Sequence, residues 1–250
     1  MRRFFVQTLP LDGSSMKITG EEFHHLVHVV RFSKGEEIEL IASNGFAKGF
    51  IQEIHREEAV VILQKVSSRD GMEYSIHLIQ GMPKIKKMDE IVEKGTEIGI
   101  HFFHPVFMTR SFSSLSASQL QEKQKRWQRI ATSAVKQSKT PHIPIISEVT
   151  TFASFFDHFS VSSRDMKIVA YEAERTQNLF SILSKGFHED SKEKHIWLCV
   201  GPEGGITDQE ISILKEHGFY EITLGNTILR TETAGYFLAG LVQYVLEFSS

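Results

Sequence analysis

The pattern of apolar and polar positions divides the chain near residue 70. Before that point, short runs rich in β-branched and aromatic side chains alternate with polar turns. These runs are FFVQTL (4–9), EEIELI (36–41), FAKGFIQEI (46–54) and EAVVILQKV (58–66). Strands this short and closely spaced are typical of a small β-barrel. Residues 21–31 interrupt them with apolar side chains on one helical face, which predicts a helix.

After the polar segment SSRDGME (67–73), strand-like and helix-like segments alternate. The expected strands are YSIHLIQ (74–80), HFFHPVF (101–107), IPIISEV (143–149), MKIVAYE (166–172), HIWLCVG (195–201) and YEITLG (220–225). The expected helices cover 85–99, 117–138, a stretch around 175–187 and 231–248. Such alternation favours a mostly parallel sheet with helices on its faces. We therefore predict a β-barrel domain over 1–72 and an α/β domain over 73–250.

Composition adds that the chain is an ordinary globular protein, with 41% hydrophobic and 24% charged residues among 250. No apolar run approaches the ~20 residues that a membrane helix needs. The N-terminal MRRFFVQTLP is too short for the core of a signal peptide. Cys199 is the single cysteine, which excludes an intrachain disulfide and fits a reducing compartment. We expect a cytoplasmic protein that does not bind membranes.

Charge is distributed unevenly, although the net charge is only −3. Residues 81–140 carry 11 basic and 5 acidic side chains, a local charge of +6, whereas residues 1–80 sum to −2 and residues 141–250 to −7. A local positive region attracts phosphate groups and suits a nucleic-acid partner. A solvated helix face such as EKQKRWQR would explain the same charges equally well.

The first candidate for chemistry is the loop Gly201-Pro202-Glu203-Gly204-Gly205, between a predicted strand and a predicted helix. That helix opens on a capping box, Thr207 with Glu210. A glycine-rich turn at the carboxyl end of a parallel strand is where open α/β sheets bind ligands, although a plain strand-to-helix turn looks the same. The chain has neither G-x-G-x-x-G nor a P-loop lysine, which argues against dinucleotide-dependent oxidoreductases, P-loop NTPases and Rossmann-type methyltransferases.

The second candidate is the loop LGNTILRTETA (224–234), between another predicted strand and the final helix. Thr231 or Thr233 can cap that helix, and the helix dipole favours Glu232 in its first turn. Arg230 is unusual there, because a cation at a helix N-terminus is disfavoured unless it interacts elsewhere. Two ligand-type loops at neighbouring strand ends can together enclose one small molecule.

GPEGG followed about twenty residues later by LGNTILRTETA resembles the SPOUT superfamily of knotted RNA methyltransferases. Within it, the chain is similar to the bacterial family that methylates N3 of a uridine in 16S ribosomal RNA. The likeness runs through the whole chain and includes RRFFV, His25, Arg31, Gly35, Lys84, KGTEIG (94–99), Arg110-Ser111 and Trp127. The segment SAVKQSKT (133–140) departs from the family pattern, since Lys136 stands where an acid is usual and Lys139-Thr140 brings no arginine.

The resemblance implies an α/β fold with a C-terminal trefoil knot, preceded by a small PUA-like RNA-binding β-barrel. It also implies S-adenosylmethionine as the cofactor, 16S ribosomal RNA or the 30S subunit as the partner, and a homodimer formed through the knotted domain. The cofactor residues it implies are Tyr171, Glu172, Val200, Gly201, Pro202, Glu203, Gly204, Leu224, Gly225, Ile228, Leu229 and Arg230. Of these, Leu224, Ile228 and Leu229 would form an apolar slot for adenine. The RNA-facing residues it implies are Arg2, Arg3, His25, Arg31, Lys84 and Arg110.

Methylation of uracil N3 requires that this nitrogen lose its proton. Arg230 could stabilise the resulting negative charge, or contact a phosphate or the cofactor carboxylate. Glu203 and Glu232 are candidate bases, but a helix N-terminus stabilises a carboxylate in its charged form and lowers its pKa. We therefore favour a structural role for Glu232 and keep Glu203 as a weak candidate base. A uridine in RNA must be splayed out to reach such a pocket.

Other interpretations remain open. One is a SPOUT enzyme that methylates the ribose 2′-hydroxyl, although the asparagine–arginine pair typical of that branch is not found. Others are a non-catalytic RNA-binding assembly factor and an unrelated α/β protein that binds a free nucleotide.

His24 and His28 are spaced as metal ligands can be, but no third ligand is obvious, and we expect no metal. The apolar face of the last helix packs in a core or, in part, forms a symmetric dimer interface.

Overall fold

The computed structural model describes residues 2–10, 12, 14–42, 44–68, 74–112, 115–138, 140–183 and 194–248. The chain forms two compact units. Unit 1 is Met1–Met72 with Pro141–Ile143, and unit 2 is Glu73–Thr140 with Pro144–Ser250. Within the described residues, no helix is both long and apolar enough to cross a membrane.

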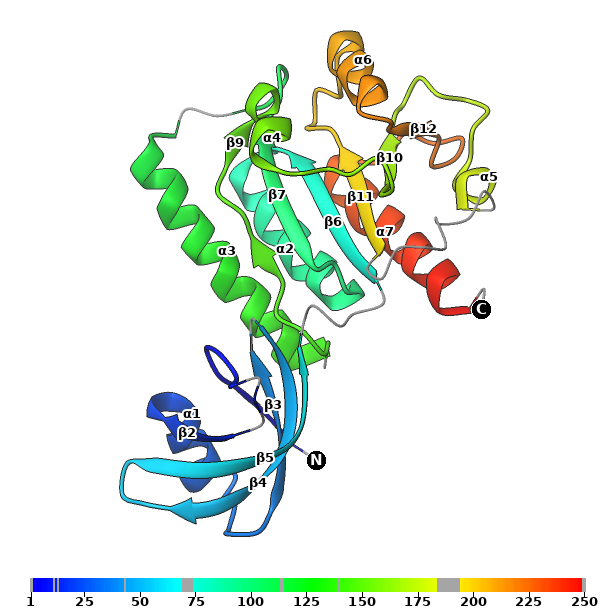
Figure 1. Ribbon diagram of the computed structural model, residues 1–250. Coiled ribbons are helices and arrows are strands. Elements are labelled where there is room, and N and C mark those ends of the chain that lie inside the picture. The colour runs from blue at the N-terminus through cyan, green and yellow to red at the C-terminus, as the bar shows by residue number, and fades with distance from the viewer. Residues whose placement is uncertain are drawn as a thin grey trace. The chain divides into compact units, whose positions relative to one another are not determined.

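Unit 1 is built on a curled sheet of five strands in the order β1-β3-β4-β5-β2 (Figure 1). The strands are β1 (Arg2–Phe5), β2 (Ser15–Thr19), β3 (Glu37–Ala42), β4 (Gly45–Ile54) and β5 (Glu58–Ser68). Buried and exposed residues alternate along β4, as expected for a sheet with one face in the core. Among the described residues no pairing joins β1 to β2. The small β-barrel expected from the sequence is therefore a curled half-barrel in the structure.

The predicted helix of unit 1 is confirmed, but its second half is wound more loosely. An α-helical turn, α1 (Gly20–His24), continues into a π-helical turn, η1 (His25–Val29). The Val30 amide accordingly donates to the His25 carbonyl at 2.9 Å, five residues back. Arg31 then ends the helix with φ 60°, a left-handed conformation that is uncommon for a residue other than glycine.

Unit 2 is an α/β unit whose strand pairs are all parallel. Its sheet has the order β12-β10-β11-β6-β7-β8, and β9 pairs with β7 beyond this path. The strands are β6 (Tyr74–Gly81), β7 (Phe102–Phe107), β8 (Ile145–Ile146), β9 (Thr150–Thr151), β10 (Met166–Ala170), β11 (Lys194–Val200) and β12 (Tyr220–Ile222). The predicted parallel sheet is thus confirmed. The expected strand 143–149 is reduced to the two residues of β8.

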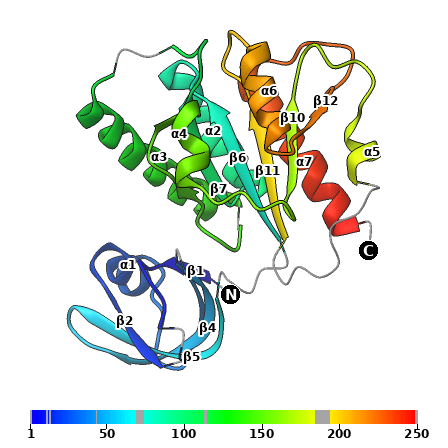
Figure 2. The ribbon, with the colours of Figure 1, turned by 45° about the horizontal axis from the view of Figure 1, so that its top comes forward.

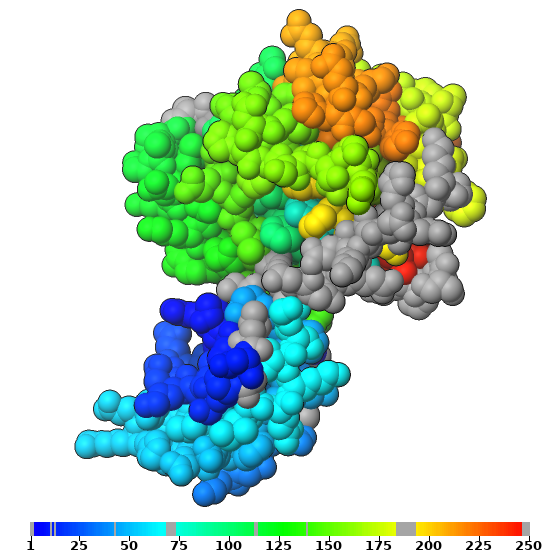
Figure 3. All heavy atoms as spheres, viewed as in Figure 1, coloured from blue at the N-terminus to red at the C-terminus, as the bar shows by residue number. Residues whose placement is uncertain are grey.

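Helices cover both faces of this sheet (Figure 2). They are α2 (Ile85–Ile98), α3 (Ala117–Ser138), α4 (Phe152–His158), α5 (Leu179–Leu183), α6 (Asp208–Glu216) and α7 (Thr231–Phe248). On one face α2 and α7 pack with Leu78, Leu198 and other apolar strand residues. On the other face α4 and α6 pack side by side (Figure 3), where the Phe156 and His217 rings stack at 3.8 Å.

The order of the strands brings three loops together at the place where such a sheet binds ligands. β11 lies between β10 and β6, and β12 lies beyond β10, so the loops that follow β10, β11 and β12 meet at one edge of the sheet. Open α/β sheets bind ligands at this carboxyl edge, where the strand order reverses. Both loops singled out in the sequence, 201–205 and 224–234, begin there.

Candidate functional site

A cavity of about 290 Å³ lies at the carboxyl ends of β10, β11 and β12. It is lined by Lys87, Ala170, Tyr171, Glu172, Arg175, Val200, Gly201, Pro202, Glu203, Gly205, Ile206, Thr223, Leu224, Gly225, Thr227, Ile228, Leu229, Arg230, Thr231 and Ala234. Apart from Gly204, every residue predicted to bind a cofactor lines it. The two candidate loops therefore enclose one space, although they are separate in the sequence.

The glycines of these loops allow the tight turns around the cavity. Gly205 has φ +75° and Gly225 has φ +123°, a region of backbone conformation that L side chains rarely adopt. Directly after the first loop, the predicted capping box is present: the Thr207 hydroxyl accepts from the Glu210 amide, and the Glu210 carboxylate accepts from the Thr207 amide. This box fixes where the loop ends and α6 begins.

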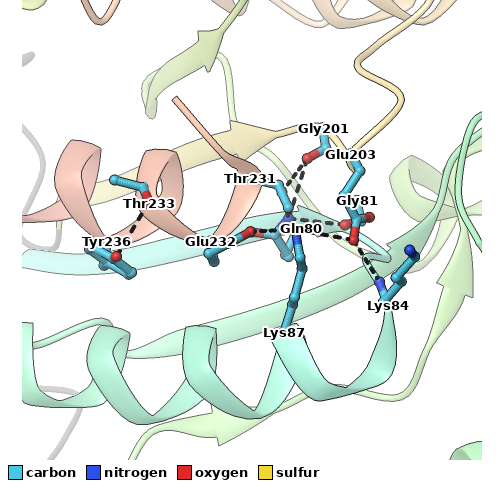
Figure 4. A network of polar contacts seen from close by, with 10 residues as sticks. All are labelled: Gln80, Gly81, Lys84, Lys87, Gly201, Glu203, Thr231, Glu232, Thr233 and Tyr236. Atoms are coloured by element: carbon cyan, nitrogen blue, oxygen red, sulfur yellow. Dashed lines mark hydrogen bonds and ion pairs between the residues drawn. The ribbon is translucent and has the colours of Figure 1, made fainter. Parts of the chain in front are cut away.

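One threonine links the two loops directly. The Thr231 hydroxyl donates to the Gly201 carbonyl at 2.6 Å and accepts from Nε2 of Gln80 at 2.8 Å (Figure 4). The sequence-based assignment of Thr231 or Thr233 as the cap of α7 is wrong. α7 begins at Thr231, and the Arg230 carbonyl accepts its first hydrogen bond, from Ala234 at 2.8 Å. Arg230 therefore occupies the cap position, and the Thr231 hydroxyl is used between the loops.

Comparison with known proteins identifies the family. A family model described as an RNA methyltransferase domain matches residues 71–243, and one described as an RNA methyltransferase PUA domain matches residues 18–64. The ribosomal RNA small subunit methyltransferase E of Bacillus subtilis is 30% identical to the chain, covering 99% of this chain and 98% of the relative. The chain belongs to this family of RNA methyltransferases.

Another relative and a solved structure agree with this family. The small subunit methyltransferase E of Aquifex aeolicus is 29% identical, over 84% of this chain and 94% of the relative. The crystal structure of the Neisseria gonorrhoeae enzyme, which is bound to S-adenosyl methionine, superposes with a TM-score of 0.74. It is 26% identical and covers 97% of both chains.

Beside the cavity of this family member, α2 contributes a lysine that the sequence analysis missed. The Lys87 ammonium lies 3.0 Å from Oε2 of Glu232 and 3.5 Å from Oε1 of Glu203. The backbone amide of Lys84 also donates to Oε1 of Glu203, at 3.2 Å. Charged groups from three separate segments, α2, the 201–205 loop and α7, thus meet at one side of the cavity (Figure 4).

The electrostatics of this group keep Glu232 ionised. Burial opposes its negative charge, but hydrogen bonds from its own backbone amide and from Lys87 outweigh burial, so the Glu232 pKa lies below its ordinary value. The hydrogen bond with Glu232, against the opposing effect of burial, raises the Lys87 pKa. A carboxylate held this way is a poor proton acceptor near neutral pH. This agrees with the structural role expected for Glu232.

The rest of the lining provides apolar surface and two exposed cations, Arg175 and Arg230. Leu224 and Leu229 are half-buried and pack against the core of unit 2. Ile228 is 74% exposed although it lines the cavity, so an apolar side chain stands at the cavity rim. The Arg230 side chain is also exposed at this rim.

The predicted RNA-facing residues are divided between the two units. In unit 2, Arg110 Nη1 donates to the carbonyl of Gly204 at 3.0 Å, and Lys84 Nζ lies 5.5 Å from the centre of the Phe112 ring. The Arg110 cation therefore lies beside the 201–205 loop, and Lys84 reaches this loop through its backbone amide, which donates to Glu203. In unit 1, Arg3 pairs with Glu39 at 2.9 Å.

Also in unit 1, the His25 ring centre lies 5.8 Å from that of Phe4, while Arg31 ends the π-helical turn. The Arg2 side chain and all of Lys139 lie outside the described residues, whereas Lys136 is exposed on α3. The His24 and His28 rings are 4.9 Å apart. In the described part of the chain, no three His, Cys, Asp or Glu side chains gather so that they could hold a metal ion.

Lys87, Gln80 and Thr231 are among the site residues that sequence reasoning missed or misassigned. A signal was present for the first two. Gln80 lies at the carboxyl end of the predicted strand 74–80, and Lys87 lies in the first turn of the helix that follows it. In a parallel sheet this end reaches the same edge as the two loops.

Proposed function

We propose that the chain methylates N3 of a uridine in the 16S ribosomal RNA of the small subunit, with S-adenosylmethionine as methyl donor. The observation that carries the proposal is the single cavity formed by the 201–205 and 224–234 loops. The family membership and the bound S-adenosyl methionine of the Neisseria relative support it. The uridine N3 specificity and the trefoil knot of the SPOUT superfamily rest on the sequence resemblance alone.

The residues around the cavity fit S-adenosylmethionine. Leu224, Ile228 and Leu229 offer apolar surface to an adenine ring, and the 201–205 loop offers backbone groups. Glu203 and Glu172 offer negative charge to a cofactor that carries an ammonium and a sulfonium group. Oε2 of Glu203 is buried without a hydrogen-bond partner in the described structure, so this oxygen is an acceptor for such a donor. When bound, the cofactor supplies an electrophilic methyl group.

The side chains at the rim would prepare the uracil. Its N3 proton must leave before the nitrogen lone pair can attack the methyl carbon. Glu203, which lines the cavity, is our candidate to accept that proton, because Lys87 lies 3.5 Å from its carboxylate but 3.0 Å from that of Glu232. Arg230 would stabilise the negative charge that spreads onto the uracil oxygens. The proton would then pass to solvent, and N3 would gain the methyl group as the bond from that group to the cofactor sulfur breaks and the neutral thioether leaves.

The RNA would approach the rim where Lys84 and Arg110 lie. The Arg110 guanidinium stands next to the 201–205 loop, and the Lys84 ammonium lies over the Phe112 ring. Phosphate contacts from such cations fix the position of an RNA strand without reading its sequence. The target uridine would be splayed out into the cavity. We assign Arg2, Arg3, His25 and Arg31 to further RNA contacts by the PUA-type unit.

We also propose that the protein is a homodimer through α7. Phe237, Leu241 and Tyr244 share one face of α7 and are 42%, 37% and 65% exposed, whereas Leu238 and Val242 are buried in the core. A second copy would cover this face by twofold symmetry. Light scattering should give a dimer mass for the wild type and a monomer mass for Phe237→Glu/Leu241→Glu. Phe180→Glu, at a side chain that is 78% exposed, is the control. A monomeric wild type would refute the interface.

The decisive experiment for the function is to incubate the protein and methyl-labelled S-adenosylmethionine with 30S subunits and, separately, with naked 16S RNA. Digestion and nucleoside mapping should find label on N3 of one uridine. Label on a ribose 2′-oxygen would assign the chain to the other branch. RNA binding without any label would indicate an assembly factor.

A further inference from the structure

Lys87 joins the two loops from outside both of them. It comes from the first turn of α2, where its neighbour Met88 is buried in the core, so its backbone is anchored. Its ammonium reaches Glu232 in the first turn of α7 and Glu203 in the 201–205 loop, and its side chain lines the cavity. Figure 4 shows the side chain rising from α2 towards both carboxylates.

We propose that Lys87 is a positioning residue for cofactor binding, which holds Glu203 and Glu232, and with them the two loops, in the arrangement that S-adenosylmethionine requires. The inference rests on the proposed function. Lys87 lies outside both loops, and from α2 it can hold a carboxylate of each loop at the same time.

Within the described residues, the two loops also have one direct link, and it is uncharged. This link is the hydrogen bond of Thr231 with Gly201, supported by Gln80. It fixes the start of the 201–205 loop but does not reach the Glu203 carboxylate. The Glu203 side chain is held instead by the Lys84 amide and by Lys87. Because one backbone amide leaves the side chain free to rotate, the ammonium is needed to fix the carboxylate beside the cavity.

The charge of Lys87 matters as much as its position. Two carboxylates, Glu203 and Glu232, face one ammonium, and their side chains are only 20% and 8% exposed. The other charged groups around them are Arg230 before α7, Lys84 at the start of α2, and Glu172 and Arg175 on the cavity wall. Without the ammonium, the two carboxylates would repel each other, and one of them would take up a proton at a higher pH.

The test compares Lys87→Met, which removes the charge at similar length, with Lys87→Arg, which keeps it. Lys86→Met, at the exposed preceding residue of α2, is the matched control. Binding of S-adenosylmethionine is measured by calorimetry from pH 5 to pH 8. We expect Lys87→Met to weaken binding about tenfold at pH 7. As the pH falls, its affinity should decrease further, because one carboxylate becomes neutral. Lys87→Arg and Lys86→Met should keep the wild-type profile.

A merely structural role would lower the melting temperature without adding this titration. Lys87→Met/Glu232→Gln provides a second measurement, because with only one carboxylate left the new pH dependence should shrink towards the wild-type profile. An unchanged affinity and profile in Lys87→Met, while the wild type binds cofactor, would overturn the inference alone. If the wild type itself did not bind S-adenosylmethionine, the proposed function would be overturned with it.

Discussion

Arg230 combines two properties at the scale of a single residue. Its carbonyl accepts the first hydrogen bond of α7, and its side chain is exposed at the cavity rim. A cation is disfavoured at a helix N-terminus, so the local structure does not explain why arginine is there. The proposed function would explain it, since negative charge would develop on the uracil when N3 loses its proton.

For this reason Arg230→Ala should reduce turnover about 100-fold, the scale of losing one stabilising donor in an active site. Cofactor affinity, measured by calorimetry, should change much less. Arg129→Ala, at an exposed position of α3, is the control and should keep full turnover. If the loss were confined to cofactor binding, Arg230 would be reassigned as a contact of the cofactor.

At the scale of an element, two glycines within helices differ in how closely their neighbours pack around them. A Cβ added at Gly95 in α2 would lie 2.8 Å from Ile100 and Phe103, whereas at Gly240 in α7 it would meet only Ile98, at 3.8 Å. Gly95→Ala should therefore destabilise the fold by about 1–3 kcal/mol through overpacking. Gly240→Ala should stabilise it by about 0.5–1 kcal/mol through helix propensity. Urea unfolding of both variants measures the difference. Equal changes in the free energy of unfolding would show that the two positions do not differ in packing as described.

Glu210 ties α6 to the segment that follows β7. Its carboxylate accepts from the amide and hydroxyl of Thr109, at 2.7 and 3.0 Å, and from Thr207. Burial opposes the charge, but these hydrogen bonds outweigh burial and hold the Glu210 pKa below its ordinary value. Because the folded-state pKa is lowered, Glu210 contributes stability above about pH 4.5, and this is lost as the pH falls through the folded-state pKa.

Glu210→Gln should therefore cost about 2 kcal/mol at pH 7. The difference from the wild type should shrink as the pH falls through the lowered folded-state pKa of Glu210, where the wild-type carboxylate takes up a proton as well. Denaturant unfolding at several pH values follows this difference. Glu216→Gln, exposed at the end of α6, should stay close to the wild type throughout. A difference that did not depend on pH would contradict the role of the charge.

The sequence predicted long elements best. The helix 117–138 agrees with α3 at both ends, because its apolar periodicity runs over many turns. β2 was missed because only Ile18 of its five residues is buried, which leaves too short an alternation to notice. α4 was missed because it has only seven residues, and three of them are phenylalanines, which favour strands.

The candidate site shows the same limit. Its two loops could be predicted because each carries its own glycine and strand–helix signals. Lys87 could not be assigned to Glu203 and Glu232 in the same way. Lys87 is more than 110 positions from either glutamate in the chain, and it meets them only because β6 lies beside β11 in the sheet. Strand order is not visible in a single sequence.

At the scale of the whole molecule, the negative net charge would disfavour binding of the proposed RNA substrate. The chain is acidic overall, at −3, yet the proposed substrate is a polyanion. The positive charge is concentrated in residues 81–140, which include Lys84 and Arg110 beside the cavity. RNA affinity should therefore depend on a few phosphate contacts and decrease steeply with salt, whereas affinity for S-adenosylmethionine, which makes no such contacts, should change little.

The slope of log affinity against log salt reports the number of phosphate contacts, at about 0.7–0.9 per contact. Arg110→Gln should reduce that slope by about one contact and weaken RNA binding to different sequences alike, because phosphate contacts do not distinguish bases. Arg164→Gln removes an equally exposed arginine from the acidic 141–250 region and should leave the slope unchanged. Equal decreases in both variants would mean that only total charge attracts the RNA. An unchanged slope in Arg110→Gln would mean that the strand approaches the cavity without this residue.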